Sequence, residues 1–334
     1  MGGGAATYAI TGCAGYLGTR LTRWLLAADP RHRVLGFDVR PPAVTDPRLE
    51  FHRLDVRDPG LAARLDGRAV QALVHLAFVL DPLYDEREMT DIDVGGTRNV
   101  LAAARAAGIP HLVATSSTTA YGARADNPVP LTEDHPLRAS AGFRYAHDKR
   151  VMDALLQEFQ AAHREVRVCT IRPCIVLGPN VANYIATLLL TLPVGALLDG
   201  ADPPLQFMHE DDLTRLVAVC LARGARGVFN AVGAGTLRLR EAAAAQRKPA
   251  LRLPAAPVYA LAWAAWKLRV TEYALPPGVL DFFRHPWVAS GAKAAAELGF
   301  TPAHDTAACL AGLVARKDAV LATFRARMRA RGRR

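Results

Sequence analysis

Short apolar runs alternate with helical patterns through the first half of the chain, and this alternation limits the possible folds more than any other feature. Runs such as ALVHLA and HLVAT are nearly continuous in apolar residues, as in parallel strands that helices cover on both faces. The pattern predicts an α/β fold with a doubly wound parallel sheet. We expect strands at 7–11, 33–38, 71–77, 110–116 and 167–172, and helices at 16–28, 92–107 and 145–163.

A glycine-rich turn follows the first expected strand and opens the first expected helix. Gly12, Gly15 and Gly18 in TGCAGYLG have a GxxGxxG spacing. Glycines let backbone N–H groups approach a pyrophosphate, and the positive end of the following helix favours that anion. The position between strand and helix therefore predicts a Rossmann-like dinucleotide site.

A carboxylate stands at the end of the second expected strand. Asp38 lies 20 residues after Gly18, where a carboxylate binds adenosine ribose hydroxyls and repels a 2′-phosphate. It favours NAD as the cofactor, although Arg40 could pair with a 2′-phosphate and leaves NADP as the less favoured choice. Asp55, in LDVRD, fits either a contact with the adenine edge or a turn or helix cap.

A tyrosine and a lysine in YAHDK share one face of an expected helix. Tyr145 and Lys149 are four residues apart, and a nearby ammonium group favours the phenolate and lowers the pKa of the tyrosine. Such a tyrosine can exchange a proton with a substrate oxygen while hydride moves at the neighbouring carbon. Ser117, at the carboxyl end of a central strand, can hydrogen-bond the reacting oxygen.

With these motifs the chain resembles the extended short-chain dehydrogenases/reductases, also called the NAD-dependent epimerase/dehydratase family. The resemblance covers nearly the whole chain. The matching segments, in the family's order and separations, are TGCAGYLG at 11–18, Asp38, LDVRD at 54–58, HLA at 75–77, TSSTTAYG at 115–122, YAHDK at 145–149, RPCIVLGP at 172–179 and FMHEDDL at 207–213.

The resemblance implies roles for particular residues. Ser117, Tyr145 and Lys149 would form the catalytic set, and Thr118 and Thr119 would contact the substrate. No metal is expected, because the five cysteines are scattered and form no zinc pattern. Together with the motifs above, the resemblance places the cofactor against Gly12, Gly15, Tyr16, Leu17, Asp38, Arg40, Asp55, Val56, Leu76, Ala77, Thr115, Tyr145, Lys149, Pro173 and Ile175.

Three departures from the family narrow the expected chemistry. Asp93 stands where the family usually has Asn in NVxGT, which leaves the water-organising role of this position open. Residues 118–121 replace the Asp-Glu pair of the sugar dehydratases, so 4,6-dehydration is not expected. Leu205 stands where nucleotide-sugar members carry Arg, and RxGD is absent. We therefore expect no nucleotide-diphosphate sugar as substrate, unless other arginines reach the cleft, namely Arg238, Arg240 or Arg284.

The expected function is that of an NAD-dependent oxidoreductase at a secondary alcohol or ketone carbon of a small substrate, with Tyr145 as acid/base. One alternative is a sugar or nucleotide-sugar epimerase that retains NAD, and another is a non-catalytic NAD(P)-binding sensor. The intact catalytic set argues against the sensor. The resemblance also implies a homodimer in which the helices near 92–107 and 145–163 pair across a two-fold axis.

The alternation of strands and helices ends at about residue 178, and the later part is richer in proline. Two apolar stretches, 186–198 and 255–266, are too short to span a bilayer, and we expect both to be buried or lobe-packing helices. The expected divisions are an NAD-binding domain over 1–177, with a segment at about 205–232 returning to it, a mostly C-terminal substrate lobe over 178–324, and a basic tail over 325–334.

The net charge is +10, and six arginines in the last ten residues supply much of it. We expect a frayed, solvated basic end, and no nucleic-acid or membrane partner, although this tail leaves either contact as an alternative. The N-terminal residues MGGGAATYAIT lack the pattern of a signal peptide. Scattered cysteines fit a reducing compartment, so we expect a cytoplasmic protein.

Overall fold

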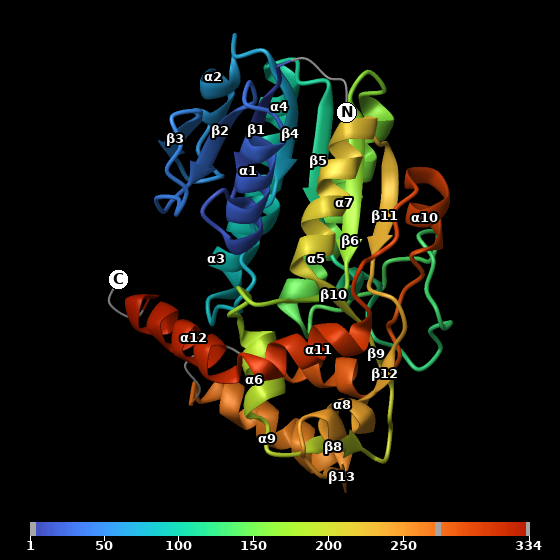
Figure 1. The fold of residues 1–334 in the computed structure, drawn as a ribbon. Coiled ribbons are helices and arrows are strands. Elements are labelled where there is room, and N and C mark those ends of the chain that lie inside the picture. The colour runs from blue at the N-terminus through green and yellow to red at the C-terminus, as the bar shows by residue number, and fades with distance from the viewer. Residues whose placement is uncertain (1–4, 271–274, 332–334) are drawn as a thin grey trace.

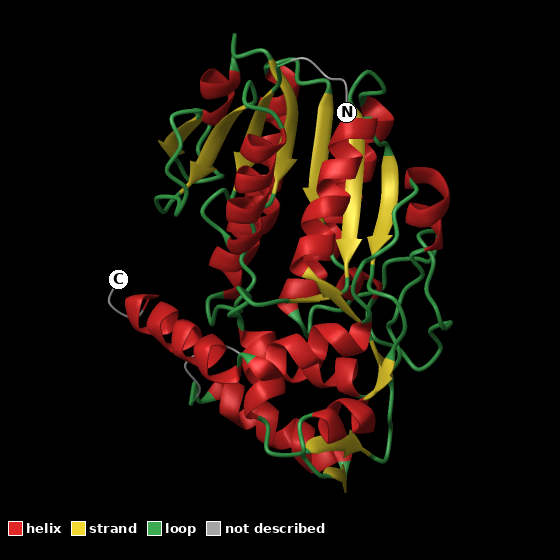
Figure 2. Cartoon of the chain, in the orientation of Figure 1, coloured by secondary structure: helices red, strands yellow, loops and turns green. Residues whose placement is uncertain are grey.

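A parallel sheet of seven strands forms the centre of the molecule (Figure 1, Figure 2). The computed structural model describes residues 5–270 and 275–331. The strands follow the order β11-β6-β5-β4-β1-β2-β3, and every neighbouring pair is parallel. They are β1 (Thr7–Thr11), β2 (Arg33–Asp38), β3 (Leu49–Arg53), β4 (Val70–His75), β5 (His111–Thr115), β6 (Arg167–Pro173) and β11 (Gly227–Ala231).

The chain changes direction across the sheet between β1 and β4. It moves from β1 outward to β2 and β3, then returns to β4 and continues to β5, β6 and β11 on the other side. The loops that leave β1 and β4 at their carboxyl ends therefore diverge and open a crevice. In open α/β sheets this crevice is where ligands bind.

Helices cover both faces of the sheet, as the continuous apolar strands predict. On one face α1 packs beside α7, and on the other α4 packs between α2 and α5. The bounds are α1 (Tyr16–Ala28), α2 (Leu61–Leu65), α3 (Glu86–Thr90), the π-helical turn η1 (Asp91–Gly95), α4 (Gly96–Ala106), the 3₁₀ turn η2 (Thr118–Tyr121), α5 (Arg144–Ala162) and α7 (Glu210–Arg223). This architecture confirms the predicted Rossmann-like, doubly wound fold.

A smaller, mainly helical lobe lies beyond the carboxyl ends of the strands (Figure 1, Figure 2). Short strands pair within it as β7 with β10, β8 with β13, and β9 with β12. Its elements, with those that return to the sheet, are β7 (Ile175–Leu177), α6 (Tyr184–Thr191), β8 (Gly195–Leu198), β9 (Pro204–Leu205), β10 (Phe207–His209), β12 (Leu237–Arg238), α8 (Leu239–Ala245), β13 (Ala250–Leu253), α9 (Ala255–Lys267), η3 (Pro277–Phe283), α10 (Ala292–Leu298), α11 (Thr306–Ala315) and α12 (Lys317–Arg331).

Of the two apolar stretches expected to form buried or lobe-packing helices, the first is helical only in part, while the second packs on the lobe through η3 but is mostly not buried. The stretch 186–198 begins in α6 but ends in the strand β8, because Pro193 prevents the helix from continuing. The stretch 255–266 does form a helix, α9, yet Ala255 is its only buried residue. Periodicity and composition identified the helix, but they did not distinguish a covered apolar surface from an exposed one.

The C-terminal segment also differs from expectation. Residues 317–331 form α12, so the predicted basic tail begins inside an ordered helix rather than a frayed end. Arg327, the third residue of the predicted tail, forms an ion pair with Asp81 at 2.9 Å. Arg333 and Arg334 lie outside the described residues.

Candidate active site

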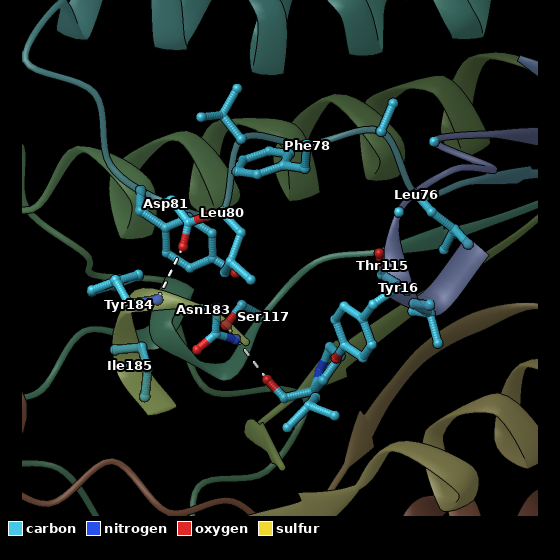
Figure 3. Close-up of a pocket in the computed structure, with 18 of the residues that line it drawn as sticks. Tyr16, Leu76, Phe78, Leu80, Asp81, Thr115, Ser117, Asn183, Tyr184 and Ile185 are labelled. Carbon is cyan, nitrogen blue, oxygen red and sulfur yellow. Dashed lines mark hydrogen bonds between the residues drawn. The ribbon is translucent and has the colours of Figure 1, made fainter. Parts of the chain in front are cut away.

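A pocket of about 810 Å³ lies between the sheet and the lobe, at the carboxyl ends of β1, β4, β5 and β6. Figure 3 shows side chains from several of these strand ends and from α6 directed toward it. Every predicted cofactor residue lines the pocket, as do the catalytic set and Thr119. The crevice between β1 and β4 therefore brings together residues that are far apart in the sequence.

The glycine loop is built for close approach of backbone. Gly12 has a φ of 74°, and a Cβ at this position would lie 2.7 Å from the backbone nitrogen of Ala77. A Cβ on Gly18 would lie only 2.2 Å from the carbonyl oxygen of Gly12. The first turn of α1 has no acidic residue, so the positive end of the helix faces the pocket uncompensated. This arrangement fits a pyrophosphate.

Asp38 is fixed at the end of β2 beside that loop. Its carboxylate accepts hydrogen bonds from the backbone N–H groups of Ala14 and Arg40, each at 3.0 Å. The Arg40 guanidinium is largely exposed, and its Nε lies 3.9 Å from Asp38 Oδ1. The Asp38 carboxylate, held so close to the glycine loop, is well placed to bind ribose hydroxyls. The Arg40 side chain, in contrast, is not fixed by a close partner.

Asp55 lines the pocket but has the contacts of a turn residue. Its two carboxylate oxygens accept hydrogen bonds from the Arg57 guanidinium at 2.9 and 2.7 Å, and one also accepts from the Arg57 backbone N–H. Of the two interpretations that the sequence leaves open for Asp55, these bonds favour the turn.

Tyr145 and Ser117 lie next to each other in the pocket, and the Ser117 hydroxyl acts to lower the pKa of the Tyr145 phenol. Ser117 Oγ also accepts from the backbone N–H of Thr119 at 3.1 Å and donates to the carbonyl oxygen of Pro173 at 3.4 Å. The rings of Phe143 and Phe78 pack against the Tyr145 ring. These contacts hold a phenol and a hydroxyl together in the pocket.

Lys149 lies beneath the same pocket, 3% exposed. Its Nζ donates to the carbonyl oxygen of Thr115 at 2.6 Å and lies 3.5 Å from the centre of the Phe78 ring. Burial lowers the pKa of Lys149 to about 7, while the charges of Asp93 and Asp153 oppose that change. Burial therefore makes the charged form of the lysine less stable than in water, and the two carboxylates partly restore it.

The net change in the pKa of Tyr145 is opposite in direction to the lowering expected from Lys149. Burial raises the pKa of Tyr145 above the usual phenol value, the Ser117 hydroxyl partly opposes this, and the charge of Asp93 raises it further. The spacing in YAHDK placed both residues correctly, but it contained no information about Asp93 or about desolvation.

Asp93, the departure from the family's Asn, is fully buried in η1. Its Oδ1 accepts a hydrogen bond from the backbone N–H of Val79 at 2.7 Å, while its Oδ2 is buried without a hydrogen-bond partner. Burial raises the pKa of this carboxyl well above its usual value, while the Val79 bond and Lys149 oppose the change. Asp93 therefore holds the pocket loop after β4 by a hydrogen bond, and its charge acts on both Lys149 and Tyr145.

The two predicted substrate threonines have different positions. Thr119 lines the pocket, and its hydroxyl donates to Ser117 Oγ at 2.9 Å. Thr118 is fully buried, and its hydroxyl donates to the Pro173 carbonyl at 3.3 Å. The expectation for Thr118 is therefore wrong, because the 3₁₀ turn η2 directs its side chain into the protein.

Sequence reasoning missed most of the wall that the lobe provides. Asp81, after β4, accepts a hydrogen bond from the backbone N–H of Tyr184 at 3.0 Å, and Figure 3 shows this contact across the pocket. The Arg327 guanidinium reaches the same carboxylate from α12. The apolar part of the wall comprises Phe78, Leu80, Phe143, Ile185, Val279, Phe282, Phe283, Trp287 and Met328.

The three arginines that could have reached the cleft have partners elsewhere. Arg240 pairs with Asp202 at 2.6 Å and Arg284 with Asp199 at 2.8 Å, while Arg238 donates to the Asp202 carbonyl. They do not line the pocket, whereas Leu205 does.

A glycine loop, a strand-end aspartate and a Ser/Tyr/Lys set around one pocket define an enzyme of the short-chain dehydrogenase/reductase type. The model of the NAD dependent epimerase/dehydratase family matches residues 8–232. The chain belongs to that family, which confirms the resemblance seen in the sequence.

Individual relatives are more distant. An uncharacterized protein of Mycobacterium tuberculosis is 25% identical over 262 residues, which cover 75% of this chain and 69% of that protein. A protein of vaccinia virus named 3 beta-hydroxysteroid dehydrogenase/Delta 5-->4-isomerase is 28% identical over 189 residues. That match covers 52% of this chain, and the chain spans about half the length of the viral protein, 53%.

Solved structures confirm the fold. UDP-glucose-4-epimerase from Stenotrophomonas maltophila, solved with bound NAD and formylated UDP-arabinopyranose, superposes with a TM-score of 0.73. It is 19% identical, and the match covers 95% of this chain and 99% of that one. Within the described residues, no helix is both long and apolar enough to cross a membrane.

Proposed function

We propose that the protein is an NAD-dependent oxidoreductase that interconverts a secondary alcohol and a ketone on an apolar substrate, with Tyr145 as acid/base. The observation that carries the proposal is the meeting of Tyr145, Ser117 and Lys149 with the glycine loop in one pocket whose lobe side is mostly apolar. The alternative of a non-catalytic sensor gives no reason for this set.

The residues present fit NAD. The glycine loop and the start of α1 would hold the pyrophosphate, Asp38 would hold the ribose hydroxyls, and Pro173 and Ile175 would lie beside the nicotinamide. Asp38 favours NAD over NADP, since its fixed carboxylate would repel a 2′-phosphate. When bound, NAD supplies the hydride acceptor or donor.

The chain's own residues handle the proton. In oxidation Tyr145 Oη takes the proton of the substrate hydroxyl while the C–H electron pair leaves as hydride, and in reduction it returns that proton. Ser117 Oγ, which Thr119 holds beside Tyr145, positions the reacting oxygen. The Lys149 charge favours the phenolate that forms on Tyr145.

The pocket wall indicates the class of substrate. Phe282, Phe283 and Trp287 offer large apolar surfaces, and few charged groups line the part of the pocket that the lobe provides. Burying an apolar ligand against such a wall is favourable in proportion to the area removed from water. The viral relative named as a hydroxysteroid dehydrogenase supports a hydroxysteroid or similarly rigid apolar alcohol.

The test is turnover with NAD and a panel of hydroxysteroids, aliphatic secondary alcohols, free sugars and nucleotide sugars. We expect apolar alcohols to react, and Tyr145→Phe to lower kcat by several orders of magnitude while NADH still binds, because only the transferable proton is lost. Tyr8→Phe, outside the pocket, is the matched control. Full turnover by the Tyr145 variant would refute the mechanism.

A nucleotide-sugar epimerase is the second candidate, and one observation favours it. Arg327 lines the pocket from α12, where it can meet a diphosphate if it leaves Asp81. Calorimetry with UDP, UDP-glucose, GDP-mannose and dTDP-glucose on the NAD-loaded protein decides between the two. Micromolar binding that Arg327→Ala abolishes would establish this second function and overturn the first choice of substrate.

A further inference from the structure

The helix α9 exposes an apolar surface on the outer side of the lobe, away from the sheet (Figure 1). Leu261 is 72% exposed, Trp263 54%, and Leu268, just after the helix, 74%. At 3.6 residues per turn the exposed positions fall on one arc of the helix. They are Ala256, Pro257, Ala260, Leu261, Trp263, Lys267 and Leu268, and Lys267 is the only charged member.

The other side of α9 is attached to the protein. The Tyr259 hydroxyl donates to Asp281 Oδ1 in η3 at 2.5 Å, and Ala255 is buried at the start of the helix. On the far side of η3, Val279 and Phe282 line the pocket. The exposed arc therefore belongs to a helix that is fixed on the outer side of the pocket wall.

The segment that carries this arc is rich in basic residues. Between Arg238 and Val270 the chain has seven lysines and arginines but one acidic residue, Glu241. All of these cationic residues except Lys248 are exposed. Of these cations, Arg240 is paired with Asp202, and Asp199, which binds the start of α9, is itself paired with Arg284. The Lys267 ammonium lies over the Trp266 ring at 4.8 Å and over the Trp263 ring at 6.0 Å. Tryptophan beside lysine is typical of side chains at a membrane–water interface.

We propose that the exposed arc of α9 docks the protein on the surface of an anionic lipid bilayer. Leu261, Trp263 and Leu268 enter the boundary between headgroups and acyl chains, and the surrounding cations face the anionic headgroups. This inference replaces the expectation that the protein has no membrane partner, and it does not depend on the proposed reaction.

Charge decides between a bilayer and a second copy of the chain. Two copies joined through this arc would bring two basic surfaces together, which is unfavourable without anions between them. An anionic bilayer satisfies the apolar and the charged parts of the surface at once.

The test is sedimentation of the full chain with vesicles of phosphatidylcholine alone or mixed with phosphatidylglycerol. We expect binding to the mixed vesicles only. Leu261→Ser with Leu268→Ser should weaken that binding by about tenfold or more, since both exposed leucines lose their apolar surface. Val129→Ser, at a residue 59% exposed elsewhere, should bind as wild type does.

Three results would overturn the proposal. The first is failure of the wild type to bind mixed vesicles, and the second is equal binding by the double serine variant. The third is self-association through the arc, seen as a dimer for the wild type and a monomer for the double variant in light scattering without lipid. Because the changed leucines are exposed, circular dichroism should show the double variant folded.

Discussion

At the scale of single residues, the site depends on the buried groups Lys149 and Asp93 and on the partly buried Tyr145, which influence one another. Lys149 has a pKa lowered to about 7, and Asp93 opposes that change. The positions of the site residues could be predicted because motifs fix them along strands and helices. Their proton affinities could not be predicted, because the charge of Asp93 comes close to Lys149 only in the folded protein.

Asp93 should set the pH range of ketone reduction. Reduction requires a protonated Tyr145 and a charged Lys149. Lys149 has the lower pKa of the two, about 7, so the rate of reduction should fall as the pH rises through that value. Asp93→Asn removes a charge that holds the lysine protonated, so this fall should move to lower pH. The pH profile of kcat/KM measures the shift. An unchanged profile would show that Asp93 is neutral in this range.

Asp38 should determine the choice of cofactor. Its carboxylate is fixed by two backbone N–H groups, so it contacts ribose hydroxyls without further ordering. Asp38→Ala should weaken NADH binding by roughly tenfold or more, since hydrogen bonds to charged groups are lost, and should affect NADPH much less. Fluorescence titration of both cofactors measures this. Arg40→Ala is the paired variant, and a wild-type preference for NADPH would contradict the assignment.

At the scale of elements, the first half of the chain was predictable because each strand and helix has a local signal. The lobe was not, since its contributions to the pocket come from contacts distant in sequence. Nothing in the sequence around Arg327 indicates that α12 returns to Asp81, 246 residues earlier. Similarly, an apolar helix such as α9 gives the same pattern whether another element covers it or solvent does.

The turn between β1 and α1 should not tolerate a side chain at its third glycine. A Cβ on Gly18 would lie 2.2 Å from the Gly12 carbonyl oxygen, so Gly18→Ala must displace the loop from α1. We expect a lower Tm and NADH affinity reduced by about tenfold or more. Gly312→Ala, where a Cβ meets no atom within 4 Å, is the control. Equal NADH affinity in both variants would refute the close-approach role.

At the scale of the whole molecule, the family resemblance implies a homodimer through α4 and α5. Both helices expose small residues, Ala102 and Ala106 on α4, and Ala154 and Ala161 on α5. Such positions let helices of two copies approach closely, and a two-fold interface is the commonest solution. The homodimer stays a prediction.

Light scattering decides the oligomeric state. We expect the wild type to have twice the mass of the 35.9 kDa chain at micromolar concentration. Ala154→Arg should yield a monomer, because two long charged side chains would meet at the two-fold axis. Ala296→Arg, exposed on α10, should leave the dimer intact. A wild-type monomer would count against the pairing.

The residues that line the pocket come from two parts of the chain that are far apart in sequence. The glycine loop and the Ser/Tyr/Lys set precede residue 150, while Thr323, Arg327 and Met328 of α12 line the same pocket. Changes confined to α12 can therefore alter which molecules the pocket accepts without disturbing the machinery that holds the cofactor. In this chain, the segment that contributes one side of the pocket can thus vary in sequence separately from the segments that hold the cofactor.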